Sequence, residues 1–251
     1  MEQIFKNKNI LISGAGKGIG KEIAIAFAKS GADVVFFDKD KEKVTEVLEE
    51  IKKIHTGKKL LAEVFDITRI NKIDSFLKKV KAEIGNIDIL VNNVGVGLVR
   101  KFPHTKEADF DFVFSTGLKG PFFLTQKVTE KMREGGNVIF ITSIHAKHPS
   151  LDPTYDSSKA AINNLVMNLA LELAKRKIRV NAIAPGHIDV EAEKKPRRQG
   201  DVPLGKKAGL PQDIANACLF LADHKKARYI IGAVLPVTGG LHIPIAKDIK
   251  F

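Results

Sequence analysis

Apolar segments alternate with amphipathic ones along the whole chain. Short runs rich in Val, Ile, Leu and Phe predict seven strands, at 9–13, 33–37, 60–65, 87–91, 138–142, 180–184 and 234–237. Apolar residues at helical spacing predict helices between them, at 17–29, 40–54, about 70–84, 107–133, 154–176 and 211–223. Strands that are apolar at nearly every position are buried on both faces, which is typical of a parallel sheet covered by helices. The pattern therefore predicts an α/β fold, a single doubly wound Rossmann-type domain over residues 1–251.

One long segment lacks this periodicity. Residues 186–209 are rich in Lys, Arg, Pro and Gly, and we expect a mobile surface loop near the carboxyl ends of the strands. Ligands bind at that edge in open α/β sheets. The segment is therefore predicted to be the substrate loop.

Composition narrows the class of protein. At 44% hydrophobic residues, the 251-residue chain is too apolar for a disordered protein. A single cysteine, Cys218, argues against a disulfide framework and fits a reducing compartment. The sequence has no run of about 18 apolar residues, and residues 1–9 lack the apolar segment of a signal peptide. We expect a cytoplasmic protein that does not cross a membrane.

The formal net charge of +12 raises the alternative of a nucleic-acid surface. The lysines are spread along the chain at polar helix positions, and the densest cluster, 194–198, is short. Dispersed lysines favour solvated helix faces over a nucleic-acid site. Retention of DNA that weakens steeply with salt would support the alternative.

A glycine-rich turn follows the first predicted strand. The sequence Ser13-Gly14-Ala15-Gly16-Lys17-Gly18-Ile19-Gly20 leads directly into a predicted helix. Glycine lets the backbone turn sharply and approach a phosphate, and the free N–H groups of a helix N-terminus favour a pyrophosphate. Between a buried strand and a helix the motif predicts dinucleotide binding. A tight turn without a ligand is the alternative.

Asp38 closes the second predicted strand. A carboxylate there accepts hydrogen bonds from both ribose hydroxyls and repels a 2′-phosphate, which favours NAD over NADP. Lys17 and Lys39 flank this position and offset the repulsion, so NADP stays open. Alternatively, or in addition, Asp38 caps the next helix.

Tyr155 and Lys159 lie four residues apart on a predicted helix, so they share one face. A tyrosine ordinarily has a pKa of about 10. A nearby ammonium and a cationic nicotinamide ring stabilise the phenolate and lower that pKa, which makes tyrosine an acid–base group near neutrality. Ser143, at the end of a strand, is placed to orient a substrate oxygen. The alternative is a surface tyrosine beside a solvated lysine.

Several motifs together resemble the short-chain dehydrogenase/reductase family. In chain order they are Gly14-x-x-x-Gly18-x-Gly20, Asp66, Asn92-Asn93-Val94-Gly95, Ser143, Tyr155-x-x-x-Lys159 and Pro185-Gly186. The C-terminal stretches 202–205, 213–215 and 237–240 also resemble the family, so the similarity covers nearly the whole chain.

The resemblance implies a role for each matching position. Tyr155 is implied as the general acid–base, Lys159 as the group that holds the ribose and depresses the tyrosine pKa, and Ser143 as the group that polarises the carbonyl. The implied cofactor-binding residues are Gly14, Lys17, Gly18, Ile19, Asp38, Asp66, Ile67, Asn93, Tyr155, Lys159 and Ile188. Among them, Asp66 and Ile67 are expected near the adenine, Asn93 near the nicotinamide ribose and Ile188 at the nicotinamide.

Three positions depart from the family pattern. Ser13 replaces a threonine and keeps its hydroxyl, and Val190 replaces a threonine that hydrogen-bonds the carboxamide. Gly117 stands where the family has an asparagine that helps relay a proton through water to the lysine. We expect activity, because the tyrosine, lysine and serine remain, with a relay that runs through other groups.

Polar residues in the predicted loops suggest the chemical class of the substrate. They are His145, His148, Asp152, His187, Asp189, Glu191 and His242. A polar rim suits a sugar or polyol better than a steroid or acyl chain, which requires an apolar wall. The alternative is that these side chains face solvent. The histidines lack paired ligand spacing on one element, so no metal is expected.

The helices at 107–133 and 154–176 resemble the pair that forms the family's dimer interface. We expect a homo-oligomer, a dimer or tetramer, because Leu165, Val166, Leu169 and Leu173 form an apolar face beyond what the sheet requires. The sequence thus predicts an NAD(P)-dependent oxidoreductase that interconverts a secondary alcohol and a carbonyl compound. The alternatives are a 3-oxoacyl-carrier-protein-type reductase and a nucleotide-binding sensor with weakened catalysis.

Overall fold

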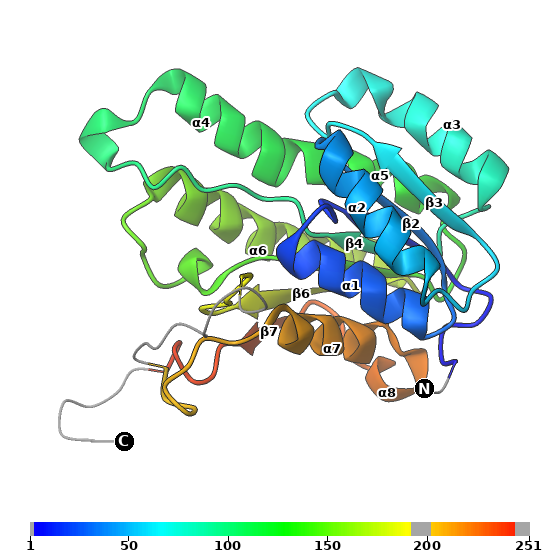
Figure 1. Cartoon of the computed structure of the whole chain (residues 1–251). Coiled ribbons are helices and arrows are strands. Elements are labelled where there is room, and N and C mark those ends of the chain that lie inside the picture. The colour runs from blue at the N-terminus through cyan, green and yellow to red at the C-terminus, as the bar shows by residue number, and fades with distance from the viewer. Residues whose placement is uncertain (1–2, 192–201, 244–251) are drawn as a thin grey trace.

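The structure, a computed structural model, describes residues 3–191 and 202–243. Seven parallel strands form one sheet in the order β3-β2-β1-β4-β5-β6-β7 (Figure 1). The strands are β1 (Asn9–Ser13), β2 (Asp33–Asp38), β3 (Leu60–Val64), β4 (Ile89–Asn92), β5 (Asn137–Ile141), β6 (Arg179–Pro185) and β7 (Val234–Val237). All seven predicted strands and the predicted fold class are confirmed.

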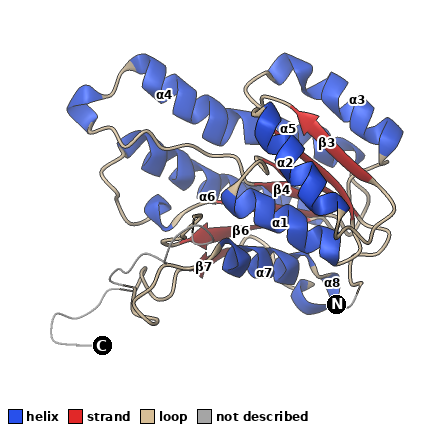
Figure 2. Ribbon diagram, in the orientation of Figure 1, coloured by secondary structure: helices blue, strands red, loops and turns tan. Residues whose placement is uncertain are grey.

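Helices connect the strands. The α-helices are α1 (Gly18–Lys29), α2 (Lys41–Lys52), α3 (Ile73–Glu83), α4 (Glu107–Phe114), α5 (Gly120–Lys131), α6 (Pro153–Ala174), α7 (Pro211–Ala222) and the short α8 (His224–Ala227). Short 3₁₀ turns lie at Ile70–Lys72, Phe102–His104 and Ile144–Ala146. Figure 2 shows the helices flanking the sheet on both sides.

Two hydrophobic layers hold the helices against the sheet. On one face, α1, α2 and α7 pack onto the strands around Ile12, Phe27 and Phe36. On the other face, α3, α5 and α6 pack around Leu11, Phe37 and Phe140. Successive residues of a strand therefore point into opposite layers, which explains why nearly every strand position is apolar.

The strand order reverses next to β1. The chain runs outward through β1, β2 and β3, then returns to place β4 on the other side of β1, with Leu11 opposite Leu90. The connections that leave the carboxyl ends of β1 and β4 thus diverge to opposite sides and open a crevice between them. The glycine-rich turn and Asn93 come directly after these two strands.

The helical stretch predicted over 107–133 is confirmed, but it is not α-helical throughout. A π-helical turn, Ser115–Lys119, separates α4 from α5. Gly117 lies inside this turn, and Gly120 and Pro121 begin α5. The apolar spacing continues through the turn, so periodicity alone did not mark the interruption. π-turns of this kind recur at functional sites.

The apolar face expected on α6 is partly wrong. Val166 is fully buried and Leu173 is 9% exposed, so both belong to the chain's own core, and Leu165 and Leu169 pack against that core. The exposed apolar side chains of α6 are Met167 and Leu171. Among the described residues, no helix is long and apolar enough to span a membrane.

Candidate active site

The predicted site residues gather at the carboxyl ends of the strands. Ser13 ends β1 and Asp38 ends β2, while Asn93 and Ser143 come shortly after β4 and β5. Tyr155 and Lys159 lie in the first two turns of α6, which packs over β6 and the 3₁₀ turn after Ser143. Parallel pairing brings these distant segments to one edge of the sheet.

Hydrogen bonds fix the glycine-rich turn to the start of the β4–α4 connection. Asn93 Nδ2 donates to the Gly14 carbonyl oxygen at 2.8 Å. The Ser13 hydroxyl accepts from Asn93 N at 3.0 Å and from Val94 N at 3.3 Å. The expectation that serine keeps the function of the family's threonine hydroxyl fits these contacts. Asn93 therefore supports the glycine-rich turn, and its contact with a nicotinamide ribose stays a prediction.

The turn leaves room for an anion at the start of α1. Gly14 has φ +65°, which glycine adopts without strain. A Cβ on Gly20 would lie 2.4 Å from Asn93 Nδ2 and still closer to the Gly14 carbonyl oxygen, so only glycine fits there. The N-cap residue Lys17 makes no side-chain cap, and the first turn carries no acidic residue. These features fit a dinucleotide pyrophosphate bound by backbone N–H groups.

Asp38 is held by the backbone around it. Its Oδ2 accepts from Gly16 N at 3.1 Å and its Oδ1 from Asp40 N at 3.2 Å. The alternative that Asp38 caps the next helix is wrong, because the N-cap of α2 is Asp40, which accepts from Glu42 N and Lys43 N. Asp38 thus joins the glycine-rich turn to the end of β2 and places a carboxylate beside it.

The two lysines beside Asp38 differ in environment. Lys17 is exposed at the start of α1. Lys39 Nζ lies 5.4 Å from the ring centroid of Phe112 in α4, a cation–π contact. The side chain of Lys39 is therefore directed toward α4.

Asp66 and Ile67 occupy different surroundings. Asp66 is half-buried, and its Oδ1 accepts from the backbone and the hydroxyl of Thr68. Ile67 is 3% exposed, and its side chain fills the space beside Gly120, where a Cβ would lie 2.9 Å away. The side chain of Ile67 belongs to the core, which leaves the half-buried Asp66 as the better placed of the two for contact with a ligand.

The predicted pairing of Tyr155 and Lys159 is present. Lys159 Nζ lies 5.6 Å from the centroid of the Tyr155 ring and donates to the Ile141 carbonyl oxygen at 2.9 Å. Ser143 is buried, and its hydroxyl accepts from His145 N at 3.1 Å. The alternative of a surface tyrosine beside a solvated lysine is wrong, because Lys159 is only 4% exposed.

Burial dominates the titration of both groups. It lowers the pKa of Lys159 to about 8. It also raises the pKa of Tyr155, and a hydrogen bond with Ser143 acts in the opposite direction. In the protein without a cofactor, the pKa of Tyr155 is therefore raised and not lowered as expected. The penalty for desolvating the phenolate exceeds the stabilisation that neighbouring groups provide.

Gly117 lies close to α6, the helix that carries Tyr155 and Lys159. A Cβ at this position would be 3.3 Å from Ser158 Oγ, which is tighter than an ordinary contact. Ser158 Oγ in turn donates to the Tyr155 carbonyl oxygen at 2.7 Å. An asparagine side chain at 117 would press on Ser158, so glycine matches this packing.

Most of the polar loop residues are bonded within the chain. Asp152 accepts four hydrogen bonds, Asp189 accepts from Glu191 N, and His242 Nδ1 lies 2.6 Å from Thr238 Oγ1. His145 Nδ1 lies 2.9 Å from the His148 carbonyl oxygen, and His187 is exposed. Across residues 3–191 and 202–243, no three His, Cys, Asp or Glu side chains are grouped to hold a metal ion.

The predicted substrate loop, residues 186–209, lies within the described part of the structure only at its two ends, 186–191 and 202–209. Ile188 forms a bridge with Gly209, which brings those ends together. Val190 lies beside the glycine-rich turn, since a Cβ on Gly18 would be 3.1 Å from its Cγ1. Residues 192–201, including the basic cluster at 194–198, lie outside the described residues.

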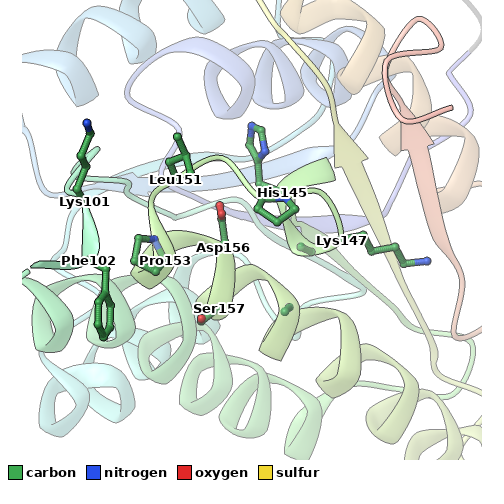
Figure 3. A pocket seen from close by; sticks show the side chains of 11 residues that line it. Lys101, Phe102, His145, Lys147, Leu151, Pro153, Asp156 and Ser157 are labelled. Atoms are coloured by element: carbon green, nitrogen blue, oxygen red, sulfur yellow. The ribbon is translucent and has the colours of Figure 1, made fainter. Parts of the chain in front are cut away.

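A cavity of about 670 Å³ lies beside the start of α6 (Figure 3). It is lined by Lys101, Phe102, His145, Ala146, Lys147, Pro149, Leu151, Pro153, Asp156, Ser157 and Ala160. Most of these side chains are apolar, with Lys101 and Lys147 at the edge in Figure 3. The His145 ring centroid is 6.5 Å from that of Tyr155. Sequence reasoning missed Phe102 and Leu151, whose only signal is an apolar residue within a loop.

Known proteins are similar to this chain over most of its length. A family model described as short chain dehydrogenase matches residues 8–201. The 7alpha-hydroxysteroid dehydrogenase of Escherichia coli is 38% identical over 243 residues, which cover 93% of each chain. The 3-oxoacyl-(acyl-carrier-protein) reductase of Staphylococcus epidermidis is 36% identical over 247 residues, covering 94% of this chain and 100% of the relative.

Solved structures agree with the fold over nearly the whole chain. A 7alpha-hydroxysteroid dehydrogenase complexed with NADH and 7-oxo glycochenodeoxycholic acid matches with a TM-score of 0.85 at 36% identity, covering 95% of this chain and 96% of that one. A putative short-chain alcohol dehydrogenase from Sinorhizobium meliloti matches with a TM-score of 0.87 at 31% identity, covering 96% and 98%.

Proposed function

We propose that Tyr155, Lys159 and Ser143 perform the proton chemistry in this chain, which belongs to the short-chain dehydrogenase/reductase family and is an NAD(P)-dependent oxidoreductase of alcohols and carbonyl compounds. The observation that carries this assignment is the burial of Lys159 against the Tyr155 ring, 5.6 Å from Nζ to the centroid. Burying an ammonium is costly, and a methionine would fill the same space without that cost. The buried lysine beside the phenol therefore indicates a functional role.

Tyr155 is the proton donor and acceptor. In reduction its hydroxyl gives a proton to the oxygen of the carbonyl compound, and in oxidation the phenolate takes the proton of the alcohol. Burial raises the pKa of Tyr155, so the isolated phenol is protonated at neutral pH and ready for the reductive direction. The oxidative direction requires added positive charge at the site.

Lys159 and Ser143 assist Tyr155 in different ways. The Lys159 ammonium supplies positive charge beneath the ring, and its bond to the Ile141 carbonyl oxygen fixes its position. The Ser143 hydroxyl, held by His145 N, orients the reacting oxygen. With oxygen held between Ser143 and Tyr155, the site favours the charge that develops there in the transition state.

The nicotinamide cofactor supplies or accepts the hydride when it is bound. The open start of α1 and the glycine-rich turn are proposed to hold its pyrophosphate, and Asp38 its adenosine ribose. We favour NADH over NADPH, because the Asp38 carboxylate is fixed by Gly16 N and because Lys39 is directed toward Phe112. Exposed Lys17 leaves some capacity for NADPH.

The chemical class of the substrate is a separate proposal. A sugar or polyol was expected from the polar loop residues, but Asp152, Asp189 and His242 are bonded within the chain. The alternative of a 3-oxoacyl-type substrate gains from the apolar cavity beside α6 and from a relative that bears that name. A carbonyl compound with an apolar body therefore becomes the leading candidate.

We also propose a homo-oligomer and residence in the cytoplasm. A groove of about 480 Å³ between α5 and α6 is lined by Phe114, Leu118, Phe122 and Leu165 among others, and Leu171 is 76% exposed on α6. Apolar surface of this kind fits a second copy of the chain. Cytoplasmic residence rests on the single cysteine, Cys218, which is buried.

One experiment tests the proposal. Purified protein is titrated with NADH and NADPH, then assayed with aldoses, polyols, 3-oxoacyl thioesters and apolar ketones by the absorbance of the reduced nicotinamide. We expect tighter binding of NADH, turnover of at least one class, and loss of that turnover in Tyr155→Phe with unchanged NADH binding. Tight binding without turnover of any class would favour the sensor alternative, and no binding of either nucleotide would refute the proposal.

A further inference from the structure

Asp152 is a buried carboxylate at the start of the catalytic helix. It is 4% exposed and is the N-cap of α6. Its Oδ1 accepts from Thr154 Oγ1 at 2.9 Å and from Tyr155 N at 3.3 Å. This half of the carboxylate is an ordinary helix cap.

The other oxygen of Asp152 binds a distant segment. Its Oδ2 accepts from Leu98 N at 3.0 Å and from Val99 N at 2.7 Å, both in the connection between β4 and α4. A helix cap does not require these two bonds. The one carboxylate therefore ties the β4–α4 connection to the first turn of the catalytic helix.

The tied segment lies against the catalytic ring. A Cβ on Gly97 would be 3.4 Å from Tyr155 Cγ and 3.2 Å from Asp152 Oδ2. The backbone at Gly97 thus packs on the ring of Tyr155, directly before the two N–H groups that Asp152 holds. A displacement of residues 97–99 would change the wall along the phenol.

Backbone strain marks the same place. Val99 has φ +53° and Leu151, the residue before Asp152, has φ +68°. Side chains disfavour this left-handed conformation, and β-branched valine does so strongly. Both side chains are exposed, at 88% and 77%, so packing does not enforce the conformation. At Val99, the bond from its N–H to Asp152 Oδ2 holds the backbone, as expected where strain is kept at a functional site.

Several charged or polar groups surround the phenol of Tyr155. They are Asp152 and Asp156 on α6, Lys159 beneath the ring, and His145 and Ser143 from the segment after β5. Both aspartates raise the pKa of Tyr155, after the larger effect of burial, while the Ser143 hydrogen bond lowers it. Ser150 N and Oγ hold Asp156, so its charge stays in place when Asp152 is changed.

We propose that Asp152 is a positioning residue for the reaction: its carboxylate holds the backbone of residues 97–99 against the ring of Tyr155 and so fixes the acid–base group. The proposal rests on the proposed role of Tyr155. A carboxylate that served only as a helix cap would affect folding stability and, through its charge, the titration of the phenol, but it would leave the turnover of the folded enzyme unchanged.

Tyrosine spectroscopy tests the proposal without a substrate. The chain has two tyrosines and no tryptophan, and Tyr229 is 93% exposed. In a Tyr229→Phe background, the absorbance of the phenolate therefore reports Tyr155 alone. A rapid jump to high pH reads the ionisation before the chain unfolds. We expect Asp152→Asn to ionise at lower pH than the parent, because a negative charge beside the phenol is removed.

Asp223 provides a matched control. It is buried, at 7% exposed, and caps α8 by accepting from Lys225 N and Lys226 N. Asp223→Asn removes the same charge from the same kind of helix cap, at the junction of α7 and α8. We expect it to lower stability without shifting the ionisation of Tyr155.

Steady-state kinetics complete the test. A small misplacement of a reacting group costs roughly 100-fold in rate. We expect Asp152→Asn to lower kcat at least 10-fold, with NADH affinity within about twofold of the parent and an acid-shifted pH profile. Asp152→Ala, which removes both oxygens, is expected to lower kcat further. If Asp152→Ala does not fold, Asp152→Asn, which keeps one acceptor oxygen, carries the test.

The outcomes separate this inference from the proposed function. If the parent enzyme turns over no carbonyl compound, the proposed function fails, and an unshifted ionisation of Tyr155 in Asp152→Asn would still overturn the inference. If the parent is active but Asp152→Asn keeps the kcat of Asp223→Asn, Asp152 is only a helix cap and the inference is overturned, whatever the shift in ionisation.

Discussion

Replacing Lys159 by methionine should stabilise the fold while removing the activity. Lys159 is 4% exposed, and burial lowers its pKa from the ordinary 10.5 to about 8. A fall of that size corresponds to on the order of 3 kcal/mol of destabilisation in the charged state. The substitution also leaves the Ile141 carbonyl oxygen without its donor, which costs about 1 kcal/mol. The net expectation for Lys159→Met at pH 7 is a gain of roughly 2 kcal/mol.

The size of the effect depends on pH. Between pH 8 and 10.5 the unfolded chain holds the lysine proton and the folded chain has lost it, so the stability of the parent rises with pH across this window. Methionine has no proton to lose. The advantage of Lys159→Met should therefore shrink from pH 7 to pH 9.5, where the buried amine of the parent is neutral.

Urea unfolding at the two pH values measures this difference, with tyrosine fluorescence as the probe. Turnover should fall by roughly 10²- to 10⁴-fold, the range for loss of acid–base assistance. A variant that is less stable than the parent at pH 7, or equally more stable at both pH values, would refute the reasoning that Lys159 is a buried charge kept for function.

Three further substitutions test other parts of the site. Gly20→Ala should raise the Kd for NADH at least 10-fold, because its Cβ would lie 2.4 Å from Asn93 Nδ2. Gly135→Ala is the control, since open space surrounds its Cβ, and it should leave NADH binding unchanged in the same titration. Asp38→Ala should weaken NADH binding about 10-fold, or 1.4 kcal/mol, and NADPH binding less, as measured by paired titrations. An equal loss for both nucleotides would contradict the assigned contact with the ribose. Val99→Asn should raise the free energy of unfolding by about 1 kcal/mol, because asparagine tolerates the φ of +53° and the valine side chain is exposed. A loss of stability would show instead that the valine side chain is packed.

The fold was predictable because its determinants are local. Strands that are apolar on both faces identify a parallel sheet, and the glycine-rich turn after β1 identifies the crevice where the order reverses. The π-turn at Ser115–Lys119 was not predictable, because the helix continues through it and the apolar pattern of 107–133 does not mark its extra residue. The burial of Val166 and Leu173 was misjudged for a related reason, since helical spacing does not say which apolar residues the sheet covers.

The site was predictable where spacing on one element decides the geometry. Tyr155 and Lys159 are one helical turn apart, so their contact follows from the sequence. The bonds from Asp152 to Leu98 and Val99 join residues more than 50 positions apart, and only the folded chain brings them together. The direction of the Tyr155 pKa also depends on burial, which spacing does not reveal.

The central claim is that Tyr155 exchanges a proton with substrate beside a bound nicotinamide. The most direct measurement compares the parent with Tyr155→Phe for NADH binding and for NADH oxidation with the best carbonyl compound of the panel. The account predicts the same Kd for NADH and a loss of turnover of roughly 10²-fold or more. Turnover of Tyr155→Phe close to that of the parent would contradict it.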